Sequence, residues 1–162
     1  MPPPRAPAAP PPIRIGWKEY LDLPDLGLGR LKGKIDTGAR TSTLHVQDLV
    51  YLERPAAGGR AAEITLAPGR RDATRLVTAR VQVLREVEVR DSGGHLELRP
   101  LIATELVLGP VRKRIFVTLS DRSGMLFRMI LGRKAMEGDF LVDPARKYLL
   151  RAWHRRRAES RR

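Results

Sequence analysis

The sequence has no cysteine and few aromatic residues. Without cysteine it can form neither a disulfide framework nor a thiolate metal site. No apolar run approaches the roughly 20 residues that a membrane-spanning helix needs, and the amino terminus lacks the apolar segment of a secretory signal. These absences predict a cytoplasmic protein with no membrane partner. Phe, Trp and Tyr make up only 5% of the chain, which leaves few side chains to stack on nucleic-acid bases.

Several cofactor-binding patterns are also missing. Gly27, Gly29 and Gly33 have the wrong spacing for a dinucleotide fingerprint, and no Gly-Lys-Ser/Thr phosphate loop occurs. The zinc-protease pattern His-Glu-x-x-His is absent, and the three histidines lie far apart in the sequence. The sequence therefore predicts no cofactor and no metal site.

Positive charge is in large excess, with a formal net charge of +13 at pH 7. About +5 of it lies in residues 151–162, and residues 13–150 keep roughly +7. A basic surface favours an acidic partner, such as nucleic acid, an anionic surface or a glutamate-rich peptide. A solvated, arginine-rich surface explains the same composition equally well.

Composition and turn signals divide the chain into three parts. Residues 1–12 contain seven prolines and predict a disordered or polyproline-like tail. In residues 13–150, turns recur every 8–15 residues between alternating apolar and polar segments, with little helix. This pattern predicts a small, closed all-β barrel with one short helix over residues 133–138. Residues 151–162 form a basic C-terminal tail.

The strand predictions follow the alternation. A long alternating run over residues 76–90 fits either one strand or two, and Asp91–His95 predicts the turn of a hairpin. Trp17 and Tyr20 are expected in the core. Further strands are expected near residues 13–16, 31–35, 41–46, 62–66, 96–108, 111–119, 127–132, 140–144 and 148–150.

One acidic loop has the residues for catalysis. The predicted strand Leu31–Ile35 runs directly into Asp36-Thr37-Gly38. The carboxylate can act as a general base on water, the hydroxyl can brace the loop, and glycine permits a close approach by a second strand. An ordinary turn after a strand favours the same three residue types. The tripeptide alone therefore leaves both interpretations open.

A late apolar segment gives this loop a partner. Ile130-Leu131-Gly132 is followed at once by Arg133 and a short helical segment. The pairing of this segment with Asp-Thr-Gly resembles the retropepsin-type aspartic protease fold. The resemblance implies that these four residues support the site: the strand passes behind the catalytic loop, and the arginine ties the core together. A glycine beside the loop allows that close packing.

Longer segments identify a more specific family. Residues 34–45, 90–95, 127–133 and 140–146 together resemble the RimB-like retropepsin-like peptidases, which are often labelled "ATP-dependent zinc protease" and are found associated with the RimK-type glutamate ligase. The resemblance implies an aspartic-type peptidase that acts on acidic or poly-α-glutamate peptides. Two parts of the label do not suit this sequence, since nothing in it binds ATP and it has no zinc-binding pattern.

The chain supplies only half of an aspartic protease site. That chemistry uses two carboxylates that share a proton, yet Asp-Thr-Gly occurs once. Asp91-Ser92-Gly93 spells a related pattern, but it lies inside the hairpin signal and has no apolar-apolar-Gly partner, so a turn is the default interpretation. The sequence predicts a symmetric homodimer in which each copy contributes Asp36.

Residues near the loop and the hairpin tip are candidate substrate contacts. Arginine and imidazolium groups can bind the carboxylates of an acidic peptide, and the alternative for each is an ordinary solvated or structural role. His154 lies in the basic tail and receives no role. The runner-up function is a basic, non-catalytic module that binds nucleic acid or an acidic protein. The predicted substrate-binding residues are Arg40, Thr41, Ser42, His45, Arg90, His95 and Arg99.

Overall fold

The computed structural model describes residues 1, 6–54, 57–69, 74–121 and 124–160. Part of the proline-rich tail (2–5), part of the turn at 121–124 (122–123) and the last two residues of the basic tail (161–162) lie outside these residues. Residues 6–12 contain no helix or strand.

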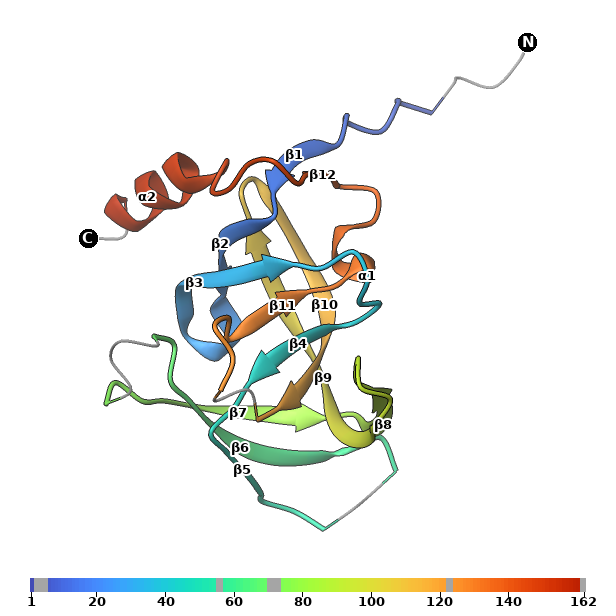
Figure 1. Cartoon of the computed structure of the whole chain (residues 1–162), viewed down its shortest axis with the longest axis vertical. Coiled ribbons are helices and arrows are strands. Elements are labelled where there is room, and N and C mark those ends of the chain that lie inside the picture. The colour runs from blue at the N-terminus through green and yellow to red at the C-terminus, as the bar shows by residue number, and fades with distance from the viewer. Residues whose placement is uncertain (2–5, 55–56, 70–73, 122–123, 161–162) are drawn as a thin grey trace.

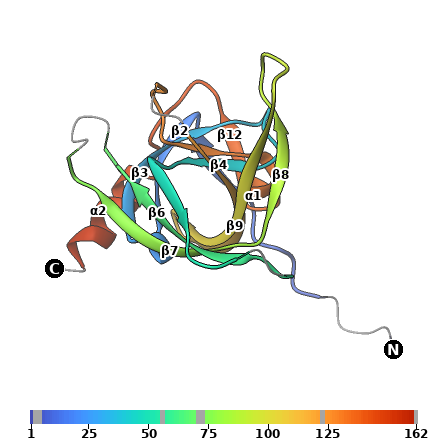
Figure 2. The ribbon, with the colours of Figure 1, turned by 90° about the horizontal axis from the view of Figure 1, so that it is seen from below.

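Six strands form a closed barrel. Their order around the ring is β10-β4-β11-β3-β2-β9, and β9 pairs again with β10 to complete it. Seen from below, β2, β3, β4 and β9 lie around one centre (Figure 2). The fold is therefore the all-β barrel expected from the sequence. The barrel strands are β2 (Lys18–Leu23), β3 (Leu28–Ile35), β4 (Ser42–His45), β9 (Leu96–Leu108), β10 (Val111–Ser120) and β11 (Met129–Leu131).

The other elements surround this barrel (Figure 1). Strand β8 (Arg85–Arg90) pairs with β9 in a long hairpin, and β1 (Ile13–Gly16) pairs in parallel with β12 (Phe140–Asp143). Strands β5 (Asp48–Tyr51), β6 (Arg60–Leu66) and β7 (Val77–Val83) form a three-stranded sheet. The helical elements are a 3-10 turn (Pro24–Leu26), the short helix α1 (Arg133–Met136), confirmed where the sequence predicts it, and α2 (Arg151–Glu159).

Alternating side chains explain why β3 belongs to the barrel wall. Leu31 and Ile35 are buried in the core, whereas Arg30, Lys32 and Lys34 between and before them are exposed. Full burial of an aliphatic side chain contributes about 1.5–3 kcal/mol. This apolar face therefore fixes the strand's register. The residue after Ile35 is Asp36, and the same alternation turns its side chain away from the core.

Some details differ from the sequence-based expectations. Residues 76–90 form two strands, which is one of the two arrangements expected, but β5 was not expected from the sequence. The strand expected over 148–150 is wrong: Tyr148 has a φ of 55°, in the left-handed region, and the next two amides donate to a buried carboxylate instead of a strand. The prediction that Trp17 lies in the core is also wrong, because its side chain is 36% exposed.

Helix α2 occupies most of the segment that the sequence marks as a basic tail. It packs on β2, and His154 at its centre is only 3% exposed. The amide of Gly109 donates to Nε2 of His154 (3.1 Å), and Nδ1 of His154 lies 3.8 Å from Oδ1 of Asp22. Nε of Arg157 lies 3.9 Å from the other oxygen of Asp22. A buried polar cluster therefore holds α2 to the barrel.

We expect this attachment to weaken in acid. Burial raises the pKa of the Asp22 carboxyl, but the polar Nδ1 of His154, 3.8 Å away, the hydrogen bond from the Arg30 amide and the charge of Arg157 together lower the pKa to below its usual value. A carboxyl whose pKa is lower in the folded state contributes stability above its unfolded pKa. That contribution is lost as the pH falls through the folded value, which here means below about pH 4.

The measurement is urea unfolding between about pH 3 and pH 7 for the wild type and Asp22→Asn. The variant should be about 1–2 kcal/mol less stable at pH 7, and its stability should fall less steeply in acid. Parallel pH curves for the two proteins would contradict this role of Asp22.

Candidate active site

Strand β11 determines where the acidic loop leaves the barrel. It lies between β3 and β4, parallel to β3 and antiparallel to β4. Leu131 pairs with Ile35, and the amide of Asp36 donates to the carbonyl oxygen of Leu131 (2.9 Å). The strand ladder therefore continues up to Asp36 itself, and the loop begins from a fixed point.

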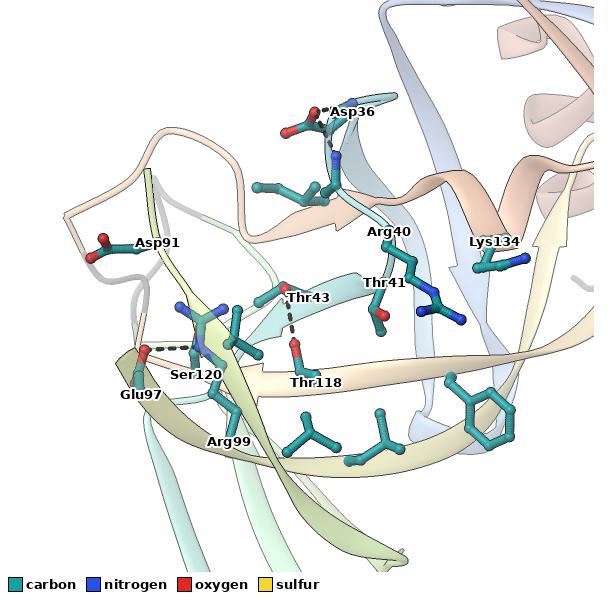
Figure 3. A pocket seen from close by; sticks show the side chains of 18 of the residues that line it. Asp36, Arg40, Thr41, Thr43, Asp91, Glu97, Arg99, Thr118, Ser120 and Lys134 are labelled. Atoms are coloured by element: carbon teal, nitrogen blue, oxygen red, sulfur yellow. Dashed lines mark hydrogen bonds and ion pairs between the residues drawn. The ribbon is translucent and has the colours of Figure 1, made fainter. Parts of the chain in front are cut away.

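Asp36 lies half-buried at the edge of a cleft (Figure 3). Its Oδ1 accepts hydrogen bonds from the amides of Gly38 (3.0 Å) and Ala39 (3.3 Å). No hydrogen bond to Oδ2 is found among the residues that the structure describes. One carboxylate oxygen is thus held by the loop backbone, and the other can interact with water or a second carboxyl group.

Gly132 allows β11 to pass directly against the loop. A Cβ at this position would lie 2.7 Å from the carbonyl carbon of Thr41 and 2.9 Å from the carbonyl oxygen of Arg40. These are backbone atoms that cannot rotate away. The Gly132 amide donates to the buried hydroxyl of Ser42 (3.0 Å), so glycine is required here for space and Ser42 supports the backbone of the site.

Arg133 holds the other side of the loop. Its Nη1 donates to the carbonyl oxygens of Thr37 and Gly38, each at 3.0 Å. Its own amide donates to the carbonyl oxygen of Ala39 (2.8 Å). The start of α1 and the acidic loop therefore form one hydrogen-bonded unit.

A pair of threonine hydroxyls lies in the cleft beneath this unit. Oγ1 of Thr43 and Oγ1 of Thr118 are 2.9 Å apart (Figure 3). The Thr118 hydroxyl also donates to the carbonyl oxygen of Ser42 (3.3 Å). The pair joins β4 to β10 across the barrel wall.

The cleft itself is large enough for a polypeptide. Its volume is about 1790 Å³, above the roughly 300–1,000 Å³ of typical small-molecule pockets. The Asp36 loop and the β8–β9 hairpin contribute to its lining (Figure 3). Its basic lining residues are Lys34, Arg40, Arg85, Arg90, Arg99, Arg114 and Lys134, and its acidic ones are Asp36, Glu88, Asp91, Glu97 and Asp121.

Some of these cations are neutralised and others are not. Three form ion pairs: Arg99 with Glu97 (2.8 Å), Arg114 with Asp25 (3.5 Å) and Lys134 with Glu137 (3.1 Å). Within the described part of the chain, the other four have no carboxylate oxygen within 4.0 Å. The unpaired cations of the cleft are Lys34, Arg40, Arg85 and Arg90.

Comparison with known families agrees with this geometry. The model of a family described as "Retropepsin-like aspartic endopeptidase RimB" matches residues 14–152. The chain belongs to the RimB-like family. This membership places it at a coarse level among peptidase-like hydrolases.

Curated relatives carry the same segment within longer proteins. A probable alpha-L-glutamate ligase of Parasynechococcus marenigrum (strain WH8102) is 39% identical over 132 residues, which cover 82% of this chain and 28% of that protein. The protein of the same name from Desulfotalea psychrophila is 34% identical over 131 residues, or 81% of this chain and 28% of that protein. The chain thus spans under a third of the length of these relatives.

A solved structure shares the fold. The crystal structure of protein Lpg0085, of unknown function, from Legionella pneumophila superposes with a TM-score of 0.69 at 26% identity, covering 85% of this chain and 98% of that one.

Of the candidate substrate-binding residues, the structure brings four to the cleft and leaves three outside its lining. Arg40, Thr41, Arg90 and Arg99 line it. Ser42 is buried against Gly132, as described above. His45 is 2% exposed, with Nδ1 3.7 Å from Oδ1 of Asp121, and His95 is exposed at the hairpin tip.

Sequence reasoning missed several lining residues of this RimB-like cleft. Trp17 and Phe127 both line it and meet edge to face, with ring centroids 6.2 Å apart. Nothing in the sequence indicated that Trp17 leaves the core. Lys34 could have been found, because it is the exposed residue closest to Asp36 in the alternation of β3.

Asp91-Ser92-Gly93 closes the β8–β9 hairpin. The Asp91 amide donates to the carbonyl oxygen of His95 (2.9 Å), and Oδ1 of Asp91 accepts from the His95 amide (2.9 Å). That backbone hydrogen bond is the main reason why the pKa of Asp91 lies below its usual value. The tripeptide therefore has the contacts of a turn, and no strand among the described residues pairs with it as β11 pairs beside the Asp36 loop.

The zinc of the family label has no matching residues in the described part of the chain. There, no three His, Asp or Glu side chains form a group that could hold a metal ion. His45 lies in β4, His95 at the hairpin tip and His154 in α2. In the same residues, no helix combines the length and the hydropathy that crossing a bilayer requires.

Proposed function

We propose that this chain is an aspartic-type peptidase that hydrolyses acidic peptides, including α-linked polyglutamate, with water activated by Asp36. The observation that carries the proposal is the Asp36 loop, held between β11 and Arg133 at the edge of a large cleft with unpaired cations. Membership in the RimB-like family supports the same type of chemistry.

The reaction needs two carboxyl groups with different protonation. One Asp36, ionised, accepts a proton from water as the water oxygen attacks the scissile carbonyl carbon. A second carboxyl group, protonated, donates to the carbonyl oxygen. The C–N bond then breaks, and the leaving nitrogen takes up a proton. Two carboxylates in close contact cannot both ionise readily, which maintains the required difference.

The second carboxyl group comes from another copy of the chain. Asp-Thr-Gly occurs once in the sequence, and no hydrogen bond joins Asp36 to another carboxyl group among the described residues. A twofold axis beside the loop would place two Asp36 side chains together. The active species in this proposal is therefore a homodimer.

The substrate class follows from the charge of the cleft. Lys34, Arg40, Arg85 and Arg90 lack carboxylate partners in the described structure, so the carboxylates of a substrate can pair with them. The same domain occurs within longer relatives that are named probable alpha-L-glutamate ligases. We infer a functional link to a RimK-type ligase, in which this peptidase hydrolyses α-glutamyl chains.

The test is hydrolysis of an α-linked oligoglutamate by the purified chain, with products identified by mass spectrometry. A Gly/Ser peptide of equal length is the matched control. We expect cleavage of the acidic peptide alone, and a specific activity that rises with protein concentration as dimers form. Absence of cleavage would contradict the proposed function. Equal cleavage of both peptides would contradict the proposed substrate class. A monomer whose specific activity does not depend on concentration would contradict the proposed dimer.

A further inference from the structure

A row of cations leaves the cleft along the outer face of β2 and β3. Lys34 and Lys32 alternate along β3, and Arg30 follows them where the backbone departs from a regular strand (φ 54°); all three are exposed. On β2, Lys18 pairs with Lys34. We call these four residues the β2–β3 track. It is continuous with the cleft, because Lys34 also lines the cleft.

The track has no counter-charges of its own. Like charges directly opposite each other on neighbouring strands are destabilising, yet Lys18 and Lys34 occupy such positions. The two carboxylates of β2, Glu19 and Asp22, are 0% and 6% exposed, and β3 has none. Within the described residues, none of the four cations forms an ion pair. Such a surface is stabilised when an anionic ligand covers it.

Aromatic rings position two of these cations, Lys18 and Arg30, without neutralising them. Tyr20 and Tyr148 stack with centroids 4.7 Å apart, and Cζ of Arg30 lies 5.4 Å from the centroid of Tyr20. Nζ of Lys18 lies 5.2 Å from the centroid of Tyr148 and 4.6 Å from that of Trp17. A cation above a ring keeps its hydrogen-bond donors, so the charged groups are held in place and remain able to bind carboxylates.

The spacing of the track suits an extended peptide. Strand residues rise about 3.3 Å each, so Lys34 and Lys32 lie roughly 7 Å apart along β3. In an extended chain, side chains on one face recur every second residue, which is the same repeat.

The ring contacts also argue against nucleic acid. Binding of single strands uses free aromatic faces as stacking platforms. Tyr20 is covered by Tyr148 and Arg30, and Lys18 lies above Tyr148 and Trp17.

We propose that the β2–β3 track binds the stretch of an acidic polypeptide that extends beyond the cleft, and so favours long acidic chains over short ones. The choice of ligand rests on the proposed function, but the binding does not require cleavage.

The experiment measures binding to the full chain carrying Asp36→Asn, so that the ligand is not hydrolysed. Fluorescein-labelled α-linked oligoglutamates of four and twelve residues are titrated and followed by anisotropy. Lys18→Ala/Lys32→Ala is compared with Arg54→Ala/Arg80→Ala, which removes two exposed cations elsewhere on the chain. We expect the track variant to weaken binding of the longer peptide about 5- to 10-fold, with less than about 2-fold change for the short peptide and for the control variant.

Three results would overturn the proposal. These are an unchanged affinity for the longer peptide, an equal loss for both lengths, or tighter binding of single-stranded DNA of matched charge with the same sensitivity to Lys18→Ala/Lys32→Ala. Cleavage of the four-residue peptide by the wild-type chain tests the proposed function separately. If that cleavage is absent while the length-dependent binding is found, the peptidase proposal fails and the track stands.

Discussion

Asp36→Asn is expected to lower the rate of acidic-peptide hydrolysis by at least about 10³-fold while leaving the fold intact. The amide keeps the Oδ1 acceptor for the Gly38 and Ala39 amides, so the loop should keep its shape. It cannot accept a proton from water, and general-base catalysis accounts for factors of roughly 10²–10⁴. The measurement is kcat/KM on α-linked oligoglutamate, with circular dichroism to check folding.

The chain offers a matched control in its second acidic tripeptide. Asp91→Asn changes the same group in the hairpin turn, and we expect it to retain activity within a few fold. Equal activity of Asp36→Asn and the wild type would refute the assignment of Asp36. A large loss of activity in Asp91→Asn alone would show that the catalytic carboxylate is Asp91 in the hairpin and not Asp36.

The same variant tests whether two copies form the site. If each active dimer needs two Asp36 carboxylates, a heterodimer of wild type and Asp36→Asn is inactive. A large excess of the variant should therefore suppress the activity of a fixed amount of wild type.

Glu19→Ala is expected to cost about 3–5 kcal/mol of folding stability. The Glu19 side chain is 0% exposed, and its Oε1 accepts from the amides of Gly16 (2.8 Å) and Leu149 (2.8 Å). Its Oε2 accepts from the amide of Leu150 (3.2 Å). Truncation leaves three amides without their acceptor and detaches the segment that leads into α2.

The measurement is the midpoint and slope of urea unfolding at neutral pH. Glu63→Ala, at an exposed position on β6, should change stability by less than about 0.5 kcal/mol. Glu19→Gln keeps one oxygen acceptor and should fall between the two. A loss below about 1 kcal/mol in Glu19→Ala would mean that the C-terminal segment is held mainly by other contacts.

The barrel could be predicted from the sequence because its strands follow local rules. Alternation in β3 and the turn residues around Asp91 depend on neighbours in the sequence. The exposure of β4 could not be predicted in the same way. In a strand with one solvated face, the polar Thr43 and His45 would point outward on either side of Leu44, but all four residues of β4 are buried. That burial depends on packing by distant parts of the chain, and the alternation of apolar and polar residues within a strand carries no information about such packing.

The features of the site also divide into those that the sequence shows and those that only the structure shows. Asp36-Thr37-Gly38 and Ile130-Leu131-Gly132-Arg133 are visible as motifs, because chemistry and close packing demand those residue types. The hydrogen bonds from Arg133 to the loop carbonyls become measurable only in three dimensions.

By itself, the sequence determined the barrel, the acidic loop, its partner strand and the basic character of the chain, since each depends on residue type and local spacing. The tertiary structure alone decided that Glu19 and His154 are buried anchors, that Trp17 leaves the core, and that Lys18 lies opposite Lys34. Each of these depends on long-range packing or strand register. A residue's burial and its neighbours are properties of the assembled chain, which no local pattern encodes.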